Sequence, residues 1–161
     1  MPIFTARGLV CSAALFAALG PGRSLQAQIG IGTWVRTAAT TSPPTSPTKM
    51  TMTVEACCGS GRKLTYHFDV NGTDMVMTVE SRFDGSEAPM LVNGKPTGGT
   101  MAIKRTDDRH TSTIVKQNGK PFGTSEATLS ADGKTLTVVN DYATPVGSQT
   151  AGKSTEIWTR K

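Results

Sequence analysis

The residues of this chain that could perform chemistry are few and far apart. Two histidines, His67 and His110, and the adjacent Cys57 and Cys58 do not match the spacing of a metal-ligand set. We find no nucleophile with a base, and no pair of carboxylates, on one face of an expected strand. The sequence therefore predicts a protein that is not an enzyme and that carries no metal and no cofactor.

Arg105 is the charged residue whose position best suits a binding role. Met101 and Ile103 mark one face of their expected strand, and Arg105 has the same parity. If that face lines a barrel interior, the guanidinium offers a forked site for a carboxylate or a phosphate. The alternative is that the strand ends near Ile103, so that Arg105 reaches solvent at the rim or pairs with Asp107.

Several methionines fall on expected inward faces, where their flexible thioethers could line an adaptable pocket. They could also fill a core that is poor in aromatic residues, which make up 6% of the chain. The residues that we expect to face the interior and contact a ligand are Met50, Met52, Leu64, Tyr66, Phe68, Met75, Met77, Val79 and Arg105.

Cys57 and Cys58 are compatible with several chemical states. Neighbouring residues of a strand point to opposite faces, so a disulfide between them requires a distorted backbone at the turn before Gly59. The two residues could instead be free thiols, one of them buried as a small apolar group, or could form a bridge to another chain. We assign the pair no functional role.

The elements that must position these residues are strands. Polar and apolar residues alternate with a period of two after Thr48, as is typical of strands with one buried face. Turn signals such as Asn71-Gly72, Asn93-Gly94 and Asn118-Gly119 recur about every 8–12 residues. Such short connections favour a meander. We predict an all-β fold, an antiparallel up-and-down β-barrel of about 8–10 strands, with a β-sandwich as the alternative.

The N-terminal segment has the layout of a secretory signal peptide. Arg7 precedes an apolar run over residues 8–19, a break follows at residues 20–22, and Ala27 offers a small residue for cleavage. The run is shorter than the roughly 20 residues that a transmembrane helix needs. We expect an exported protein of the periplasm or the extracellular space, with no stable membrane anchor.

The domain division follows from this leader. We expect a signal peptide over residues 1–27 and a single barrel domain over residues 28–161, with a Pro-rich loop over residues 37–48. The net charge is +5, but lysines and arginines are scattered among acids and threonines. Nucleic acid is therefore not an expected partner, because its binding favours a basic stripe with interleaved aromatic residues.

Both ends of the predicted barrel carry residues that resemble a known superfamily. Gly32-Thr33-Trp34 resembles the Gly-x-Trp motif of the first strand of calycins, the lipocalins and their relatives. Arg160 resembles the basic residue of their last strand, which stacks over that tryptophan and gains about 0.5–2 kcal/mol. The resemblance implies a lipocalin-like fold in which Gly32, Trp34 and Arg160 have structural roles.

A second resemblance covers the later strands. Residues 101–107, 116–120 and 129–138 are similar to small exported bacterial proteins of lipocalin-like type, whose functions are mostly unassigned. This resemblance implies a fold and an exported location, and it brings no catalytic residues.

Two function classes follow for such a barrel. The first is a non-catalytic binding protein for a small apolar or amphipathic ligand. The alternative is a structural or interaction protein whose barrel is filled by its own side chains and which acts through its outer surface. An interior cavity of about 300 Å³ or more favours the first, and a filled interior with an exposed apolar patch favours the second.

Overall fold

The computed structural model of the chain describes residues 30–40, 49–143 and 151–161. The expected signal peptide and residues 41–48 of the expected Pro-rich loop lie outside these ranges. Residues 37–40, which the sequence placed in that loop, form the end of the first strand. None of the described residues belongs to a helix long and apolar enough to cross a membrane.

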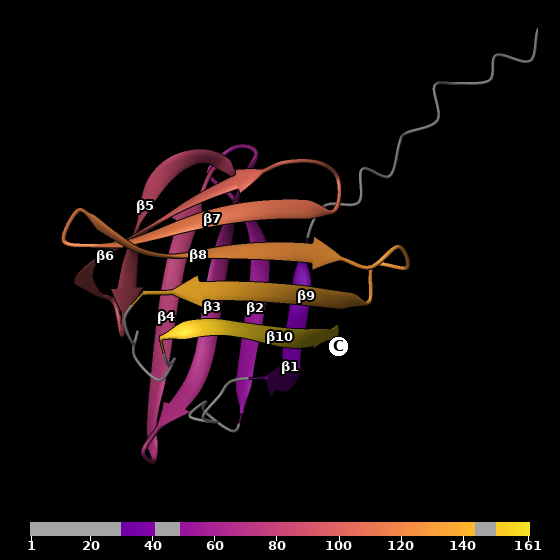
Figure 1. Cartoon of the computed structure of the whole chain (residues 1–161), viewed down its shortest axis with the longest axis horizontal. Coiled ribbons are helices and arrows are strands. Elements are labelled where there is room, and N and C mark those ends of the chain that lie inside the picture. The colour runs from indigo at the N-terminus through magenta and orange to yellow at the C-terminus, as the bar shows by residue number, and fades with distance from the viewer. Residues whose placement is uncertain (1–29, 41–48, 144–150) are drawn as a thin grey trace, which may run out of the picture.

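The described residues form a closed barrel of ten antiparallel strands in which each strand pairs with its neighbours in sequence (Figure 1). The predicted up-and-down β-barrel is therefore confirmed, and the sandwich alternative is excluded. The strands are β1 (Gly32–Thr40), β2 (Met50–Cys57), β3 (Gly61–Val70), β4 (Thr73–Ser81), β5 (Asp84–Val92), β6 (Lys95–Arg105), β7 (His110–Gln117), β8 (Lys120–Leu129), β9 (Thr135–Tyr142) and β10 (Gly152–Arg160).

Asparagine-glycine pairs make three of the tight connections. The turns at Asn71-Gly72, Asn93-Gly94 and Asn118-Gly119 each place both residues at positive φ, between 48° and 81°. Two such residues in succession make the turn whose twist matches paired strands, and asparagine and glycine tolerate it best. In the first of these turns Val70 pairs with Thr73, so the connection has two residues and sets the register of β3 against β4.

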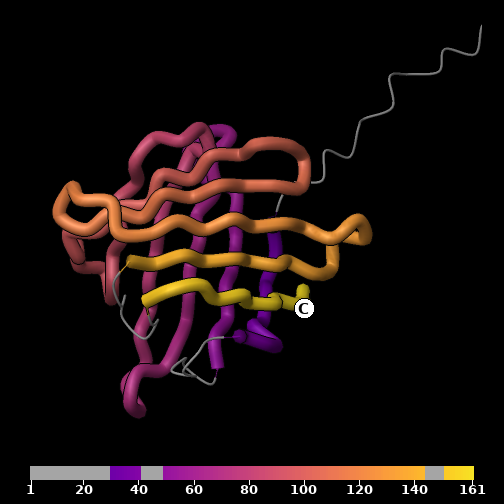
Figure 2. Tube along the Cα trace, in the orientation of Figure 1, coloured from indigo at the N-terminus to yellow at the C-terminus, as the bar shows by residue number. Residues whose placement is uncertain are grey.

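The β1–β10 pair closes the barrel, and the indigo first strand and the yellow last strand lie beside each other (Figure 2). Trp34 on β1 is fully buried and lies opposite Arg160 on β10. The indole Nε1 donates a hydrogen bond to the carbonyl of Gly30 at 2.6 Å, and the guanidinium carbon lies 5.7 Å from the centre of the ring. Arg160 also donates to the carbonyl of Ile31. These contacts hold the N-terminal end of β1 against the C-terminal end of β10.

Gly32 makes this close approach feasible. Its φ is +133°, and a Cβ atom placed there would lie 3.0 Å from Nε of Arg160. A side chain would therefore have both a strained backbone and a crowded contact with the guanidinium. Gly32, Trp34 and Arg160 together form one end cap of the barrel.

Replacing Trp34 by alanine should lower the free energy of unfolding by about 3–5 kcal/mol, because it removes a fully buried indole and leaves a void. Urea titration followed by circular dichroism measures the change. The control is Ile114→Ala, at a side chain that is 46% exposed, with an expected effect within about 0.5 kcal/mol. Equal effects of the two substitutions would show that the end cap does not support the barrel.

Candidate functional site

The barrel encloses a cavity of about 140 Å³. Eight of the ten strands contribute to it, all but β1 and β5, and so do the two apolar clusters of the core. The lining residues are Gly30, Met50, Met52, Val54, Leu64, Tyr66, Met77, Phe83, Met101, Ile103, Thr111, Thr113, Ser125, Ala127, Leu136, Val138, Asn140, Tyr142, Glu156 and Trp158. Twenty residues thus define a single site in the middle of the fold.

One side of the cavity is apolar. It comes from β2, β3, β4 and β6, where the inward positions carry Met50, Met52, Leu64, Met77 and Met101. Four of these five are methionines, whose unbranched side chains can adjust to the shape of a partner. Period-two alternation explains the arrangement, since every second residue of these strands turns toward the interior.

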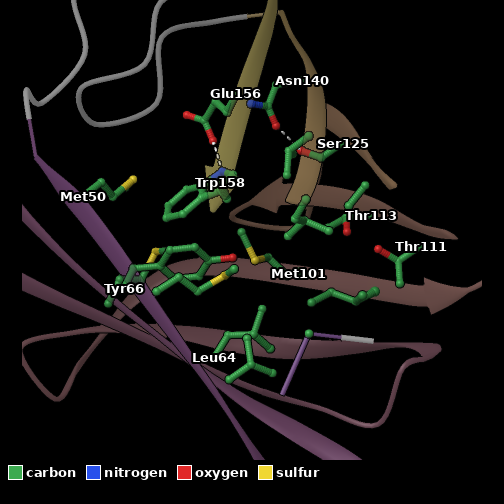
Figure 3. A pocket seen from close by; sticks show the side chains of 18 of the residues that line it. Met50, Leu64, Tyr66, Met101, Thr111, Thr113, Ser125, Asn140, Glu156 and Trp158 are labelled. Carbon is green, nitrogen blue, oxygen red and sulfur yellow. Dashed lines mark hydrogen bonds between the residues drawn. The ribbon is translucent and has the colours of Figure 1, made fainter. Parts of the chain in front are cut away.

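The side built from β7, β8 and β9 carries most of the polar groups of the lining, beside the apolar Ala127, Leu136 and Val138. Ser125 on β8 donates from Oγ to Oδ1 of Asn140 at 2.6 Å, and the hydroxyl of Tyr142 lies 3.3 Å from the same oxygen. Nδ2 of Asn140 donates to Ser154 at 3.4 Å. Figure 3 shows Asn140 and Ser125 on the side of the cavity opposite Leu64. Hydrogen-bonding groups are therefore concentrated on one side of the cavity, and the opposite side is mainly apolar.

A buried ion pair stands at the closure of the barrel. Nη1 of Arg36 on β1 lies 2.9 Å from Oε1 of Glu156 on β10, and their side chains are 5% and 7% exposed. Nε1 of Trp158 donates to the other carboxylate oxygen at 3.2 Å. Each partner thus neutralises a charge that would be costly to bury alone. Glu156 borders the cavity, but Arg36 does not belong to its lining.

The two tyrosines of the lining are held in their neutral form. Burial, which destabilises the phenolate, is the main cause that raises the pKa of Tyr66, and the nearby charge of Glu156 adds to it. Burial also raises the pKa of Tyr142, although its hydrogen bond with Ser125 opposes the shift. At neutral pH both hydroxyls are therefore able to donate a proton in a hydrogen bond.

Five of the nine residues expected to contact a ligand line the cavity: Met50, Met52, Leu64, Tyr66 and Met77. The structure brings these five together from β2, β3 and β4.

Three more of the expected residues lie outside the lining. Phe68 packs on the larger apolar cluster, and Val79 is a member of the smaller one. Phe68 and Met75 are cross-strand partners near the turn that joins β3 to β4, where the sulfur of Met75 accepts a hydrogen bond from Asn93 at 3.7 Å. Parity identified the face of these residues but not which of them border the open space, since Phe68 lies opposite Met50 and Val79 lies opposite Leu64, and both of those partners line the cavity.

Arg105 also lies outside the lining, at the rim of the barrel. Its Nε donates to the carbonyl of Asp107 at 3.0 Å, and its guanidinium forms an ion pair with the carboxylate of Asp108. Strand β6 ends at Arg105, so the turn that follows provides these acceptors. The interior position expected from parity is therefore wrong, and Arg105 occupies the rim position that the sequence also allowed.

The polar lining residues and the ion pair were not recognised from the sequence. Arg36 has the parity of Trp34, and Glu156 has the parity of Trp158, so both signals were present. Asn140 likewise has the parity of Leu136. With the exception of Arg105, sequence reasoning selected the apolar residues and Tyr66 of each inward face and took the other charged and polar residues to be exposed.

Cys57 and Cys58 are joined by a disulfide at the turn between β2 and β3. The backbone distortion expected for such a bond is present, since Cys58 has a φ of 47°. A carboxylate oxygen of Glu80 and the two sulfurs lie within 4.8 Å of one another. This is the one cluster of potential metal ligands within the described ranges, and its sulfurs are bonded to each other rather than available as thiolates.

Comparison with known proteins supports the fold. No family model and no curated protein matches the chain. Similar solved structures include two variants of the fluorescent protein UnaG, with a single asparagine replaced by alanine in one and by glutamine in the other. The alanine variant has a TM-score of 0.56 and 12% identity, over 81% of this chain and 95% of its own. The glutamine variant has a TM-score of 0.54 and 13% identity, over 81% and 94%. At such identity the likeness concerns the fold alone.

The raised tyrosine pKa values lead to a spectroscopic prediction. The chain has two tyrosines, both in the cavity lining, so the folded protein should show little tyrosinate absorbance near 295 nm at about pH 10.5. The protein unfolded in urea at that pH should show about three-quarters of the full tyrosinate signal, because the ordinary pKa of tyrosine is about 10. Because the unfolded state loses protons first, the free energy of unfolding should fall as the pH rises above about 10. Titration of the folded protein with a pKa near 10 would contradict this assignment.

Replacing Glu156 by glutamine should lower the free energy of unfolding by about 3 kcal/mol, because it leaves the buried Arg36 without its counter-charge. The double variant Arg36→Met/Glu156→Gln removes both charges and should recover at least half of that loss. Glu87→Gln is the matched control, since its pair with Lys116 is exposed and screened by solvent. Urea denaturation compares the four proteins. A double variant less stable than Glu156→Gln would show that the pair is not the source of the effect.

Proposed function

We propose that this chain is an exported, non-catalytic binding protein whose barrel holds a small amphipathic ligand. The observation that carries the proposal is the interior cavity, whose lining is mainly apolar on β2, β3, β4 and β6 and carries most of its polar groups on β7, β8 and β9. Small-molecule sites generally combine such an apolar lining with a few placed polar groups. A barrel filled by its own side chains would have no need of a polar inner wall next to an open space.

The size of the cavity limits the ligand. Its volume of about 140 Å³ lies below the 300 Å³ that we set as the mark of a carrier, and below the range of drug-sized sites. It is close to the roughly 150 Å³ of an apolar cavity that accepts benzene. The ligand that fits best is therefore compact, with about one ring, and the methionines allow modest enlargement.

The proposed location rests on two features. The first 27 residues have the charge, apolar run and small residues of a secretory signal peptide. The disulfide of Cys57 and Cys58 suits an oxidising compartment such as the periplasm or the extracellular space.

The absence of catalysis is part of the proposal. Glu156, the carboxylate of the cavity, is engaged by Arg36 and by the indole of Trp158. His67 is exposed on β3, and His110 pairs with Asp107 at 2.7 Å beside the start of β7. Neither histidine lines the cavity. A general acid or base would have to act on the ligand from within it.

The test is native mass spectrometry of the protein purified gently from the exported fraction of its own host, with a denatured sample as control. We expect a small molecule that is released on denaturation. Ala127→Met should abolish its retention, because Ala127 lines the cavity and a longer side chain fills the space. Ala102→Met is the matched control, since Ala102 is half-buried on β6 and is not a lining residue.

Retention by the wild type and by Ala102→Met, with loss in Ala127→Met, would place the ligand in the barrel. A bare mass for the wild type, together with no binding of small aromatic probes by calorimetry, would sink the proposal. It would favour an interaction protein that acts through its outer surface.

A further inference from the structure

Three hydroxyls of the cavity lining, those of Thr111, Thr113 and Tyr66, form no hydrogen bond within the described residues, whereas Ser125 and Tyr142 do. Of these three, the phenol of Tyr66 is the strongest donor. The side chain comes from β3, and its ring packs edge-on against Trp158 with centroids 6.2 Å apart. Its hydroxyl points from β3 toward Met101 on β6 (Figure 3). Within residues 30–40, 49–143 and 151–161, no side chain or carbonyl forms a hydrogen bond with it.

Tyr66 is half-buried, and its hydroxyl faces the cavity without a partner among the described residues, so it is available to an occupant. Burial raises the pKa of Tyr66, so the hydroxyl stays protonated and can act as a donor. An occupant of the cavity with an oxygen or nitrogen acceptor would satisfy it. By contrast, the hydroxyl of Tyr142 already lies 3.3 Å from both Asn140 and Ser125. The two tyrosines of the lining therefore differ in what they can offer to a ligand.

The charges of the site favour a neutral occupant. Among the described lining residues the ionisable side chains are Tyr66, Tyr142 and Glu156. A ligand anion would find no cation in this lining and would face the carboxylate. A ligand cation would find that carboxylate already neutralised by Arg36 at 2.9 Å. Either charge would lose its hydration without gaining a free counter-charge.

We propose that the cavity selects an uncharged, single-ring ligand whose hydrogen-bond acceptor is received by the hydroxyl of Tyr66. The ring packs against the methionines of β2, β4 and β6, and the acceptor lies toward Tyr66. Because this inference rests on the proposed ligand-binding function, its test must separate binding itself from the selection of the ligand.

Four probes of one shape separate them. Acetophenone, cumene, benzoate and benzamidinium each join a phenyl ring to a three-atom branched group, which is respectively a neutral acceptor, apolar, anionic and cationic. Isothermal titration calorimetry on the full folded barrel at neutral pH measures the affinity of each. We expect acetophenone to bind at least about tenfold more tightly than either ion, because the ions must be desolvated.

Tyr66→Phe removes the hydroxyl and keeps the ring. It should weaken acetophenone about three- to tenfold, as expected for the loss of one buried hydrogen bond, and leave cumene within about twofold. Tyr142→Phe is the matched control, because that hydroxyl is already engaged by Asn140 and Ser125. It should leave the ratio of the two affinities unchanged. Circular dichroism verifies that both variants are folded.

The outcomes separate the two claims. Binding of cumene and acetophenone with the same ratio in wild type and Tyr66→Phe would retain the ligand-binding function and overturn the role of Tyr66. Benzoate or benzamidinium as the tightest probe would overturn the selection of an uncharged ligand. No binding of any probe to the folded wild type would count against the proposed function, and the inference would fall with it.

Discussion

Closure of the barrel between its first and last strands is the constraint on which the interior depends. β1 and β10 are separated by most of the chain, yet they pair from Trp34 opposite Arg160 to Thr40 opposite Thr155. Without that pairing both strands would be open edges, with unpaired backbone groups. The pairing also brings Arg36 to Glu156, so the ion pair exists only in the closed barrel. We call this β1–β10 pair the seam of the barrel. The guanidinium of Arg160 stacks on Trp34 at one end of the seam, and the buried pair of Arg36 and Glu156 lies further along it.

The same seam explains why a charged pair is tolerated in the interior. Each ion would be expensive to bury alone, but here each carries the counter-charge of the other. The carboxylate also accepts the indole proton of Trp158, which satisfies a further polar group. The seam therefore contributes a polar, charge-balanced edge to an otherwise apolar end of the core. Because the charges of this wall are balanced, an uncharged occupant is accommodated, whereas an ion would lose its hydration without gaining a free counter-charge.

Stability and the proposed function place opposite demands on the interior of this barrel. A better-packed interior would replace the cavity and the unpartnered hydroxyl of Tyr66 by apolar contacts, and it would be more stable. Asn140, Ser125 and Tyr142 satisfy one another and so cost less than separate buried polar groups would. The methionines facing them supply apolar area without a rigid shape. The cavity is thus bordered both by polar side chains that satisfy one another and by flexible apolar side chains. Such a combination suits a small amphipathic ligand.

The amino-acid sequence alone determined the fold of this protein and much of its inner face. Alternation with a period of two, together with asparagine-glycine turns, specifies strands and short hairpins by local rules, and these led to the barrel and to Met50, Met52, Leu64, Tyr66 and Met77. Only the tertiary structure decided where along the barrel each inward residue lies and which side chains it contacts. Phe68 and Met75 have inward parity but lie near the end of a hairpin, and Arg105 is taken by acceptors of the next turn. Arg36 and Glu156 are 120 residues apart in sequence. Their meeting depends on the closed register of the whole barrel, because a long-range contact of this kind has no local signature.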